Sequence, residues 1–279
     1  LLDRVVSVFG NMLSAETNDD LQELAQKIMP LLSEHSNNIT LNEKLFARVK
    51  EVYAQKESLQ LTQEQTRLLD DIYDSFVRHG ANLEGEAREQ YRQLTNELSK
   101  LTLDFSENNL KETNRYQMLL TNKDHIAGLP DIIVEAAAET AKSEDKEGWA
   151  FTLHAPSYVP FMTYADNREL RRKLYMAYNT KCTHDNETNN LEIVKKLVNT
   201  RLAIAQLLGY SSFAEYNLQE RMAENSGNVY KLLDQLLDAY TPTAKQEYAE
   251  VEALARQLEG SDFTVMPWDW SCLLYTSPS

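Results

Sequence analysis

The spacing of apolar residues along the chain predicts long helices. Between residues 87 and 105 they recur at intervals of four, three, four, three and four, which places them on one face of a helix. These residues are Ala87, Tyr91, Leu94, Leu98, Leu101 and Phe105. The stripe covers fewer than three heptads, which favours packing against another helix of the same chain over a free-standing coiled coil.

Helix start and stop signals divide the first 80 residues into further helices. One or two helices are expected over residues 1–29, with Pro30 as a stop. The motif Thr40-x-x-Glu43 resembles a capping box, which opens a second helical segment. A third helix is expected from Thr62 to His79-Gly80, where the glycine supplies a left-handed cap.

The centre of the chain differs from the rest. A short helix is expected from Leu129-Pro130 through Ala141, and a polar loop follows it over residues 143–148. Trp149, Phe151 and Leu153 then alternate with smaller or polar residues, which is typical of a strand. Because Pro156 and Pro160 follow, we expect only a small β element near residues 149–164.

The last third of the chain returns to a helical pattern. Asp166-x-x-Glu169 and Ser212-x-x-Glu215 are both expected to cap helices, and a long helix is expected from about Asn190 to Gly209. Thr241-Pro242 is expected to divide the last two helices, and Gly260 to end the second.

Composition supports a mainly α fold and narrows the function classes. Of 279 residues only 8 are Gly and 7 Pro, which leaves few breaks between helices. The formal charge of −15 argues against nucleic-acid binding. No apolar run approaches the ~20 residues of a membrane span. The chain opens in mid-pattern at Leu1-Leu2-Asp3-Arg4, so we expect that its true start is missing; we expect a cytoplasmic protein.

Motifs for chemistry are missing from this sequence. A helix-borne zinc site needs His-Glu-x-x-His, and none of the five histidines begins that motif. They are His35, His79, His125, His154 and His184. Cys182 lies two residues from His184, a spacing that usually turns two side chains in different directions, and no Gly-rich phosphate loop is present. We therefore assign no catalytic, cofactor-binding or metal-ligating residue.

Several segments together resemble one family, the zinc metallopeptidases that comprise thimet oligopeptidase, oligopeptidase A and the peptidyl-dipeptidases. The resemblance covers about residues 1–271 and is closest to the peptidyl-dipeptidase branch. The segments that carry it are Phe76–Leu83, Glu107–Leu110, Gly148–Leu153, Pro156–Met162, Arg168–Arg171, Ala177-Tyr178, Ala205–Tyr210, Ala214–Tyr216, Arg221–Ala223 and Pro267-Trp268-Asp269-Trp270.

The resemblance implies a fold of long helices in two halves around a deep channel, with small β elements. It also implies a zinc ion in the full-length protein, held by a His-Glu-x-x-His helix and a glutamate that lie beyond Pro267-Trp268-Asp269-Trp270. No zinc is therefore expected in this chain. Tyr158 and Tyr164 invite comparison with the family's substrate-clamping tyrosine, but nothing in their setting supports that role. Residues 1–271 are expected to be the N-terminal helical part, and residues 272–279 a tail that is not native.

The resulting hypothesis is a fragment of a zinc-dependent peptidase that cleaves short peptides and releases dipeptides from their C-termini. The fragment alone is expected to be inactive, because its partner is the missing C-terminal half of the same chain. The alternative is a catalytically silent helical scaffold or peptide-binding module. A downstream His-Glu-x-x-His would favour the peptidase.

Overall fold

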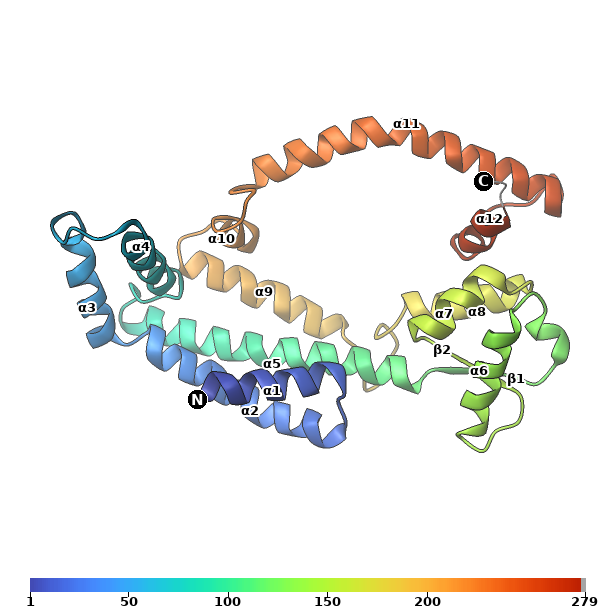
Figure 1. Ribbon diagram of the computed structural model, residues 1–279, viewed down its shortest axis with the longest axis horizontal. Coiled ribbons are helices and arrows are strands. Elements are labelled where there is room, and N and C mark those ends of the chain that lie inside the picture. The colour runs from blue at the N-terminus through green and yellow to red at the C-terminus, as the bar shows by residue number, and fades with distance from the viewer. Residues whose placement is uncertain (277–279) are drawn as a thin grey trace. The chain divides into compact units, whose positions relative to one another are not determined.

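The computed structural model describes residues 1–276, which are mostly helical (Figure 1). They form two compact units. The first contains residues 1–107 and 192–226, and the second contains residues 108–191 and the chain from Gly227 onward. The expected fold class, mainly α with a small β element, is confirmed. The boundary expected between residues 271 and 272 falls inside the last helix, Trp270–Thr276, and residues 277–279 of the proposed tail lie outside the described part of the chain.

The first unit is built on one long helix. Its elements are α1 (Leu2–Ala15), α2 (Asp19–Thr40), α3 (Glu43–Ala54), a 3₁₀ turn (Lys56–Ser58), α4 (Gln63–Arg78), α5 (Gly85–Arg115), α9 (Leu191–Leu207) and α10 (Phe213–Leu218). The predicted apolar stripe lies on α5, where Tyr91 is buried together with Leu41 and Ile204. The expectation that this stripe packs inside its own chain is confirmed.

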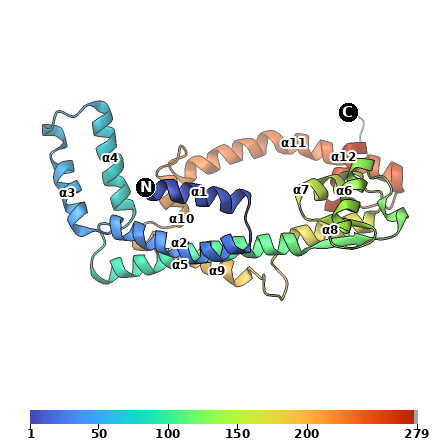
Figure 2. The same ribbon diagram turned by 60° about the horizontal axis from the view of Figure 1, so that its bottom comes forward.

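Polar side chains fix α2 along α5, and Figures 1 and 2 show the two helices side by side. Ser33 donates a hydrogen bond to Asn96 at 2.8 Å, and the amide of Asn37 donates one to Thr95 at 2.9 Å. Pro30 lies inside α2, so the expected stop there is wrong. A proline removes one backbone N–H, and α2 is hydrogen-bonded to α5 on both sides of Pro30, through Gln26 to Asp104 and through Ser33 to Asn96.

The N-caps of α3 and of α8 (Arg168–Asn179) are not the residues expected from the sequence, Thr40 and Asp166. Asn42 caps α3 by accepting a hydrogen bond from the Leu45 N–H, and Asn167 caps α8 in the same way with the Leu170 N–H. Thr40, proposed as the first of these caps, is instead the last residue of α2. Asparagine is a stronger N-cap than threonine, which agrees with Asn42 capping α3 in place of Thr40. The helix start expected at Thr62 and the cap expected at Ser212 are confirmed, and the side chains of both residues cap their helices.

The second unit surrounds a two-stranded sheet. Its elements are β1 (Gln117–Leu120), a 3₁₀ turn (Lys123–Ile126), α6 (Asp131–Lys142), β2 (Trp149–Thr152), α7 (Ala155–Tyr164), α8 (Arg168–Asn179), α11 (Ser226–Glu259), a 3₁₀ turn (Pro267–Asp269) and α12 (Trp270–Thr276). The strands are antiparallel, with Gln117 opposite Thr152 and Leu120 opposite Trp149. Phe151 of β2 and Phe161 of α7 are fully buried and meet edge to face at 4.6 Å between ring centroids.

The expected β element is shorter than residues 149–164. The strand ends at Thr152, and Ala155–Tyr164 is the helix α7. Pro156 lies in the first turn of this helix, where its missing N–H costs no hydrogen bond, so a proline signal expected to weaken a strand instead opens a helix. The partner strand β1 comes from residues 117–120, which the sequence pattern did not identify.

A single helix, α11, occupies the region that was expected to be divided at Thr241-Pro242. It runs from Ser226 to Glu259 with Pro242 inside, and Figure 1 shows it as a curved ribbon. The proline removes one N–H from the ladder, which bends a helix without always ending it. Here the Thr241 hydroxyl donates to the carbonyl of Leu237 at 2.5 Å, an additional contact in the same turn.

Two glycines allow close approaches in the second unit. Gly128 and Gly148 have φ of 82° and 109°, in the left-handed region that other residues rarely adopt. A Cβ atom on Gly128 would overlap the backbone oxygen of Tyr164, and one on Gly148 would overlap the backbone oxygen of Leu120. These two glycines therefore set how closely the loops at either end of α6 lie against α7 and β1.

Candidate functional site

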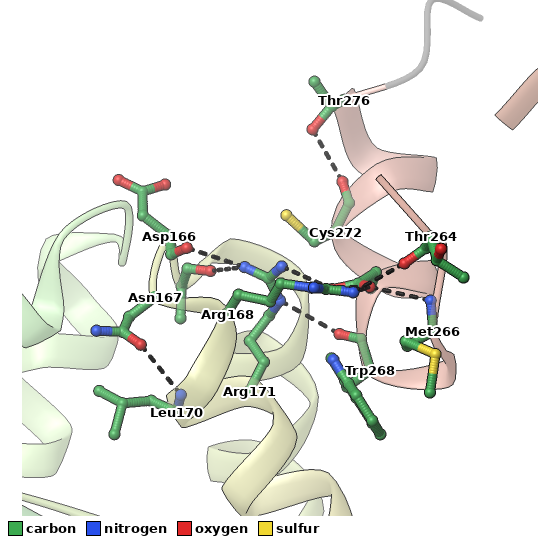
Figure 3. A network of polar contacts seen from close by, with 12 residues as sticks. Asp166, Asn167, Arg168, Leu170, Arg171, Thr264, Met266, Trp268, Cys272 and Thr276 are labelled. Carbon is green, nitrogen blue, oxygen red and sulfur yellow. Dashed lines mark hydrogen bonds and ion pairs between the residues drawn. The ribbon is translucent and has the colours of Figure 1, made fainter. Parts of the chain in front are cut away.

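One buried carboxylate organises the most extensive polar network in the second unit. Asp269 is 0% exposed. Its Oδ2 accepts a hydrogen bond from Nη2 of Arg168 at 2.7 Å, and its Oδ1 accepts one from Nη2 of Arg171 at 3.1 Å. The Met266 N–H also donates to Oδ2, at 3.0 Å. Figure 3 shows both arginines of α8 pointing toward the segment that carries Thr264, Met266 and Trp268.

The two arginines use their remaining donors on backbone oxygens. Nη1 of Arg171 donates to Ala165 O at 2.6 Å, and its Nε donates to Trp268 O at 3.2 Å. Nη2 of Arg168 donates to Thr264 O at 2.9 Å. The guanidinium of Arg168 also lies 4.4 Å from the centroid of the Phe263 ring, within cation–π range. The network therefore ties residues 263–269 to α8 and to the end of α7.

The electrostatics keep Asp269 charged. Burial by itself raises the pKa of this carboxyl group, but the hydrogen bonds from Arg168, the Met266 N–H and Arg171 outweigh burial, so the pKa of Asp269 is lowered. The pKa of Arg168 is raised, chiefly by its hydrogen bond to Asp269. A fully paired carboxylate with a lowered pKa is a poor proton acceptor. Asp269 therefore acts in positioning the chain and is not a general base.

A second pair of segments meets in the first unit. The guanidinium of Arg78, at the end of α4, lies 4.6 Å from the ring centroid of Tyr216 in α10. Its Nη2 donates to Tyr216 O at 2.9 Å, the Tyr216 hydroxyl donates back to Arg78 O at 3.3 Å, and Nε of Arg78 pairs with Glu220 at 2.7 Å. Arg78 and Tyr216 thus each donate a hydrogen bond to the other's backbone oxygen, which links α4 to α10.

The two tyrosines singled out from the sequence have structural surroundings. Tyr158 stacks on Tyr178 at 4.2 Å between centroids, and burial, helped by neighbouring Tyr175, raises the pKa of Tyr158 to about 12. Tyr164 meets Tyr275 edge to face at 4.8 Å. Both rings pack on other aromatic rings, and their setting adds no support for a substrate-clamping role.

Residues 1–276 contain no group of three or more His, Cys, Asp or Glu side chains that could hold a metal ion. His35, His79, His154 and His184 are exposed, and His125 is half-buried. The side chains present therefore do not fit the zinc ion implied by the family resemblance. Cys182 is buried, and burial raises the pKa of its thiol, while the ring of His184 contacts the Thr180 hydroxyl at 3.2 Å.

The sequence pattern did not predict the pairing of distant segments. Arg168–Arg171 and Pro267–Trp270 were each identified as family-like segments, as were Phe76–Leu83 and Ala214–Tyr216, but nothing predicted that they meet. A signal was available in the first case. Arg168 and Arg171 are three residues apart on one helix face, and Asp269 stands between two tryptophans, an apolar setting that calls for a buried partner.

Comparison with known proteins finds one matching family model. Residues 161–275, which include the end of α7, all of α8 and the whole Asp269 network, match the model of peptidase family M3. No helix among the described residues combines the length and apolarity needed to cross a membrane.

Similarity to individual relatives extends over nearly the whole chain. Over 96% of its own length, the chain is 30% identical to Oligopeptidase A of Haemophilus influenzae. Over 97% of its own length, it is 30% identical to Dipeptidyl carboxypeptidase of Escherichia coli. It is 27% identical to Probable cytosolic oligopeptidase A of Arabidopsis thaliana, again over 97%. The chain spans 40% of the length of each of these relatives. The chain is 30% identical both to oligopeptidase A and to dipeptidyl carboxypeptidase. The preference for the peptidyl-dipeptidase branch therefore stays a prediction. The family resemblance itself is confirmed: residues 161–275 match the model of peptidase family M3, and nearly the whole chain is similar to oligopeptidase A and dipeptidyl carboxypeptidase.

Proposed function

We propose that this chain is part of a zinc-dependent peptidase that cleaves short peptides and releases dipeptides from their C-termini. The observation that carries the proposal is the alignment of 96–97% of the chain with oligopeptidase A and dipeptidyl carboxypeptidase proteins. The match of residues 161–275 to the model of peptidase family M3 supports it. We propose the cytoplasm as its location.

The chain's own contribution is structural in this proposal. Its described residues supply no donor set for zinc, so the metal and the reacting groups are contributed by a part of the longer protein that these residues do not include. The Asp269 network holds residues 263–269 in place against α8. The 279-residue chain by itself is expected to have no peptidase activity.

Extending the reading frame beyond codon 279 provides the test. The longer protein and the 279-residue chain are produced side by side and incubated with a short peptide, and the products are identified by mass spectrometry. The proposal expects products shortened by two C-terminal residues from the longer protein only, with loss of activity after treatment with a chelator. Cleavage at internal bonds, also of peptides with an amidated C-terminus, would indicate an endopeptidase.

Two outcomes contradict the proposal. Chelator-sensitive hydrolysis by the 279-residue chain would show that its own residues form the site. A longer frame without His-Glu-x-x-His and without activity would favour the alternative, a catalytically silent helical scaffold or peptide-binding module.

A further inference from the structure

An apolar stripe runs along α11 (Ser226–Glu259), and only part of it is covered. Tyr230, Leu233, Leu237 and Tyr240 recur at intervals of three, four and three, the spacing of a helix–helix seam. They are 65%, 50%, 64% and 66% exposed. Large apolar side chains scattered singly on a surface need no explanation, but four on one helix face form a contiguous patch.

The same stripe continues into a region where the chain itself covers it. Four and eight residues after Tyr240 come Ala244 and Tyr248, and then Val251 and Ala255, which are 5% and 0% exposed. Val251 and Ala255 pack with Leu273 of α12, and Phe263, Val265 and Trp270 pack around them. Tyr248 stacks on Trp270 at 5.8 Å between ring centroids. The C-terminal half of the stripe is thus covered by apolar side chains of the segment that follows α11, of which Trp270 lies on the helix α12. Leu273 lies in the stretch expected to be non-native, so Phe263, Val265 and Trp270 carry the comparison.

We propose that the uncovered half of the stripe, Tyr230 to Tyr240, is a docking surface for an apolar-faced helical segment from the remainder of the longer protein. The argument is continuity. The apolar repeat continues along one face of α11, and its C-terminal half is covered by apolar side chains of the same chain, in part from the helix α12. The chain spans 40% of its relatives' length, which leaves more than half of such a protein to supply the segment. The inference therefore rests on the proposed membership in a longer peptidase.

Charge disfavours a second copy of this chain as the occupant. The chain carries a formal charge of −15, so two copies repel one another. Asp234 and Asp238 flank Leu233 and Leu237 on the uncovered half, where Lys231 is the nearest base in sequence. A docking helix with lysine or arginine beside its apolar face matches this arrangement, because rim charges of opposite sign steer and align two surfaces.

The test compares two double variants of equal charge. Leu233→Glu with Leu237→Glu places two carboxylates in the stripe. Gln235→Glu with Ala239→Glu places two carboxylates on the opposite face of the same helix. In the 279-residue chain both pairs of positions are exposed, so both variants should keep the helical circular dichroism and the thermal midpoint of the parent. This measurement confirms that each variant folds.

Hydrogen exchange then reports whether α11 is covered. In the longer protein, amides of residues 230–240 should exchange at least about tenfold more slowly than in the 279-residue chain. The Leu233/Leu237 variant should lose that protection, and the Gln235/Ala239 variant should keep it. Equal exchange in the two chain lengths would overturn the inference, as would equal loss of protection in both variants. Concentration-dependent dimerisation of the 279-residue chain that only the Leu233/Leu237 variant abolishes would also overturn it, in favour of a second copy.

The proposed docking surface and the proposed peptidase function are contradicted by different outcomes. Protection of residues 230–240 in a longer protein without peptidase activity supports the docking surface and contradicts the proposed function. Peptidase activity with these amides unprotected does the reverse. A reading frame that ends within a few codons of Ser279 contradicts both.

Discussion

Asp269 and Arg171 lie 98 residues apart in the sequence and form a buried ion pair at 3.1 Å. Their side chains are 1% and 8% exposed. Asp269 also pairs with Arg168, at 2.7 Å, whereas Asp269 is the carboxylate that pairs with the buried Arg171. Such a pair contributes less to stability than its removal costs, since removing one member leaves the other charge buried and unpaired.

The first prediction follows from this asymmetry. Asp269→Ala is expected to lower the free energy of unfolding by about 3–5 kcal/mol, because it strands the buried guanidinium of Arg171. Urea denaturation monitored by circular dichroism measures the change. Glu169→Ala is the matched control, since Glu169 forms an exposed pair with Arg172 and should change stability by less than about 1 kcal/mol. Equal effects of the two substitutions would contradict the role given to Asp269.

The second prediction concerns pH. The pKa of Asp269 is lower in the folded protein than in the unfolded chain, so the folded state binds fewer protons at this group. Its contribution to stability is therefore complete above the unfolded value of about 3.9 and is lost as pH falls through the folded pKa. The difference in unfolding free energy between the parent and Asp269→Asn should be constant from pH 7 to about pH 5 and shrink below about pH 4. A difference that grows on acidification would reverse the assigned direction of the pKa shift.

The third prediction separates two kinds of glycine. Gly148→Ala should destabilise the second unit by more than about 1 kcal/mol, because φ of 109° is unfavourable for alanine and the new Cβ would overlap Leu120 O. Gly10→Ala should instead stabilise the protein by roughly 0.5–1 kcal/mol, because Gly10 lies inside α1 with no atom within 4 Å of the added methyl group. Thermal melts of both variants decide the matter, and shifts of the same sign would argue against this account.

The fourth prediction tests why α2 continues through Pro30. If the contacts of Ser33 and Asn37 with α5 hold the helix together, Asn37→Ala should cost about 1 kcal/mol or more, since it leaves the Thr95 hydroxyl without one partner. Pro30→Ala should raise stability, because it restores an N–H to the helix interior. Hydrogen exchange of residues 31–40 provides the second readout. Loss of helix after Pro30→Ala would show that the proline is required where it stands.

Much of the fold could be read from local signals. Features that depend on residues close together in sequence could be predicted. They include the stripe on α5, the helix starts at Thr62 and Ser212, and the glycines that end α4, α9 and α11. Proline was misjudged at Pro30 and Pro242 because a local rule says that the residue disturbs a helix, whereas packing and the length of the flanking turns decide whether the helix ends there. Strand β1 escaped notice because a four-residue strand carries little pattern until its partner is known.

The candidate site was out of reach for a different reason. Arg171 and Asp269 are ordinary charged residues until the fold removes water from them. Which carboxylate approaches which guanidinium depends on tertiary contacts about 100 residues apart in the sequence. The absence of a His-Glu-x-x-His motif could be read directly from the five histidines, because that motif is local.

The separation between α8 and Asp269 also has a consequence for synthesis on the ribosome. Arg168 and Arg171 leave the ribosome about 100 residues before the carboxylate that neutralises them. At translation rates of roughly 5–20 residues per second, the arginines wait on the order of 5–20 s for their partner. During that interval, burial of Arg171 would leave its charge without a carboxylate partner, which is energetically costly. Closure of this part of the second unit is therefore expected to be late and timed by elongation, so that a pause in translation between codons 171 and 269 would prolong an open, chaperone-accessible state.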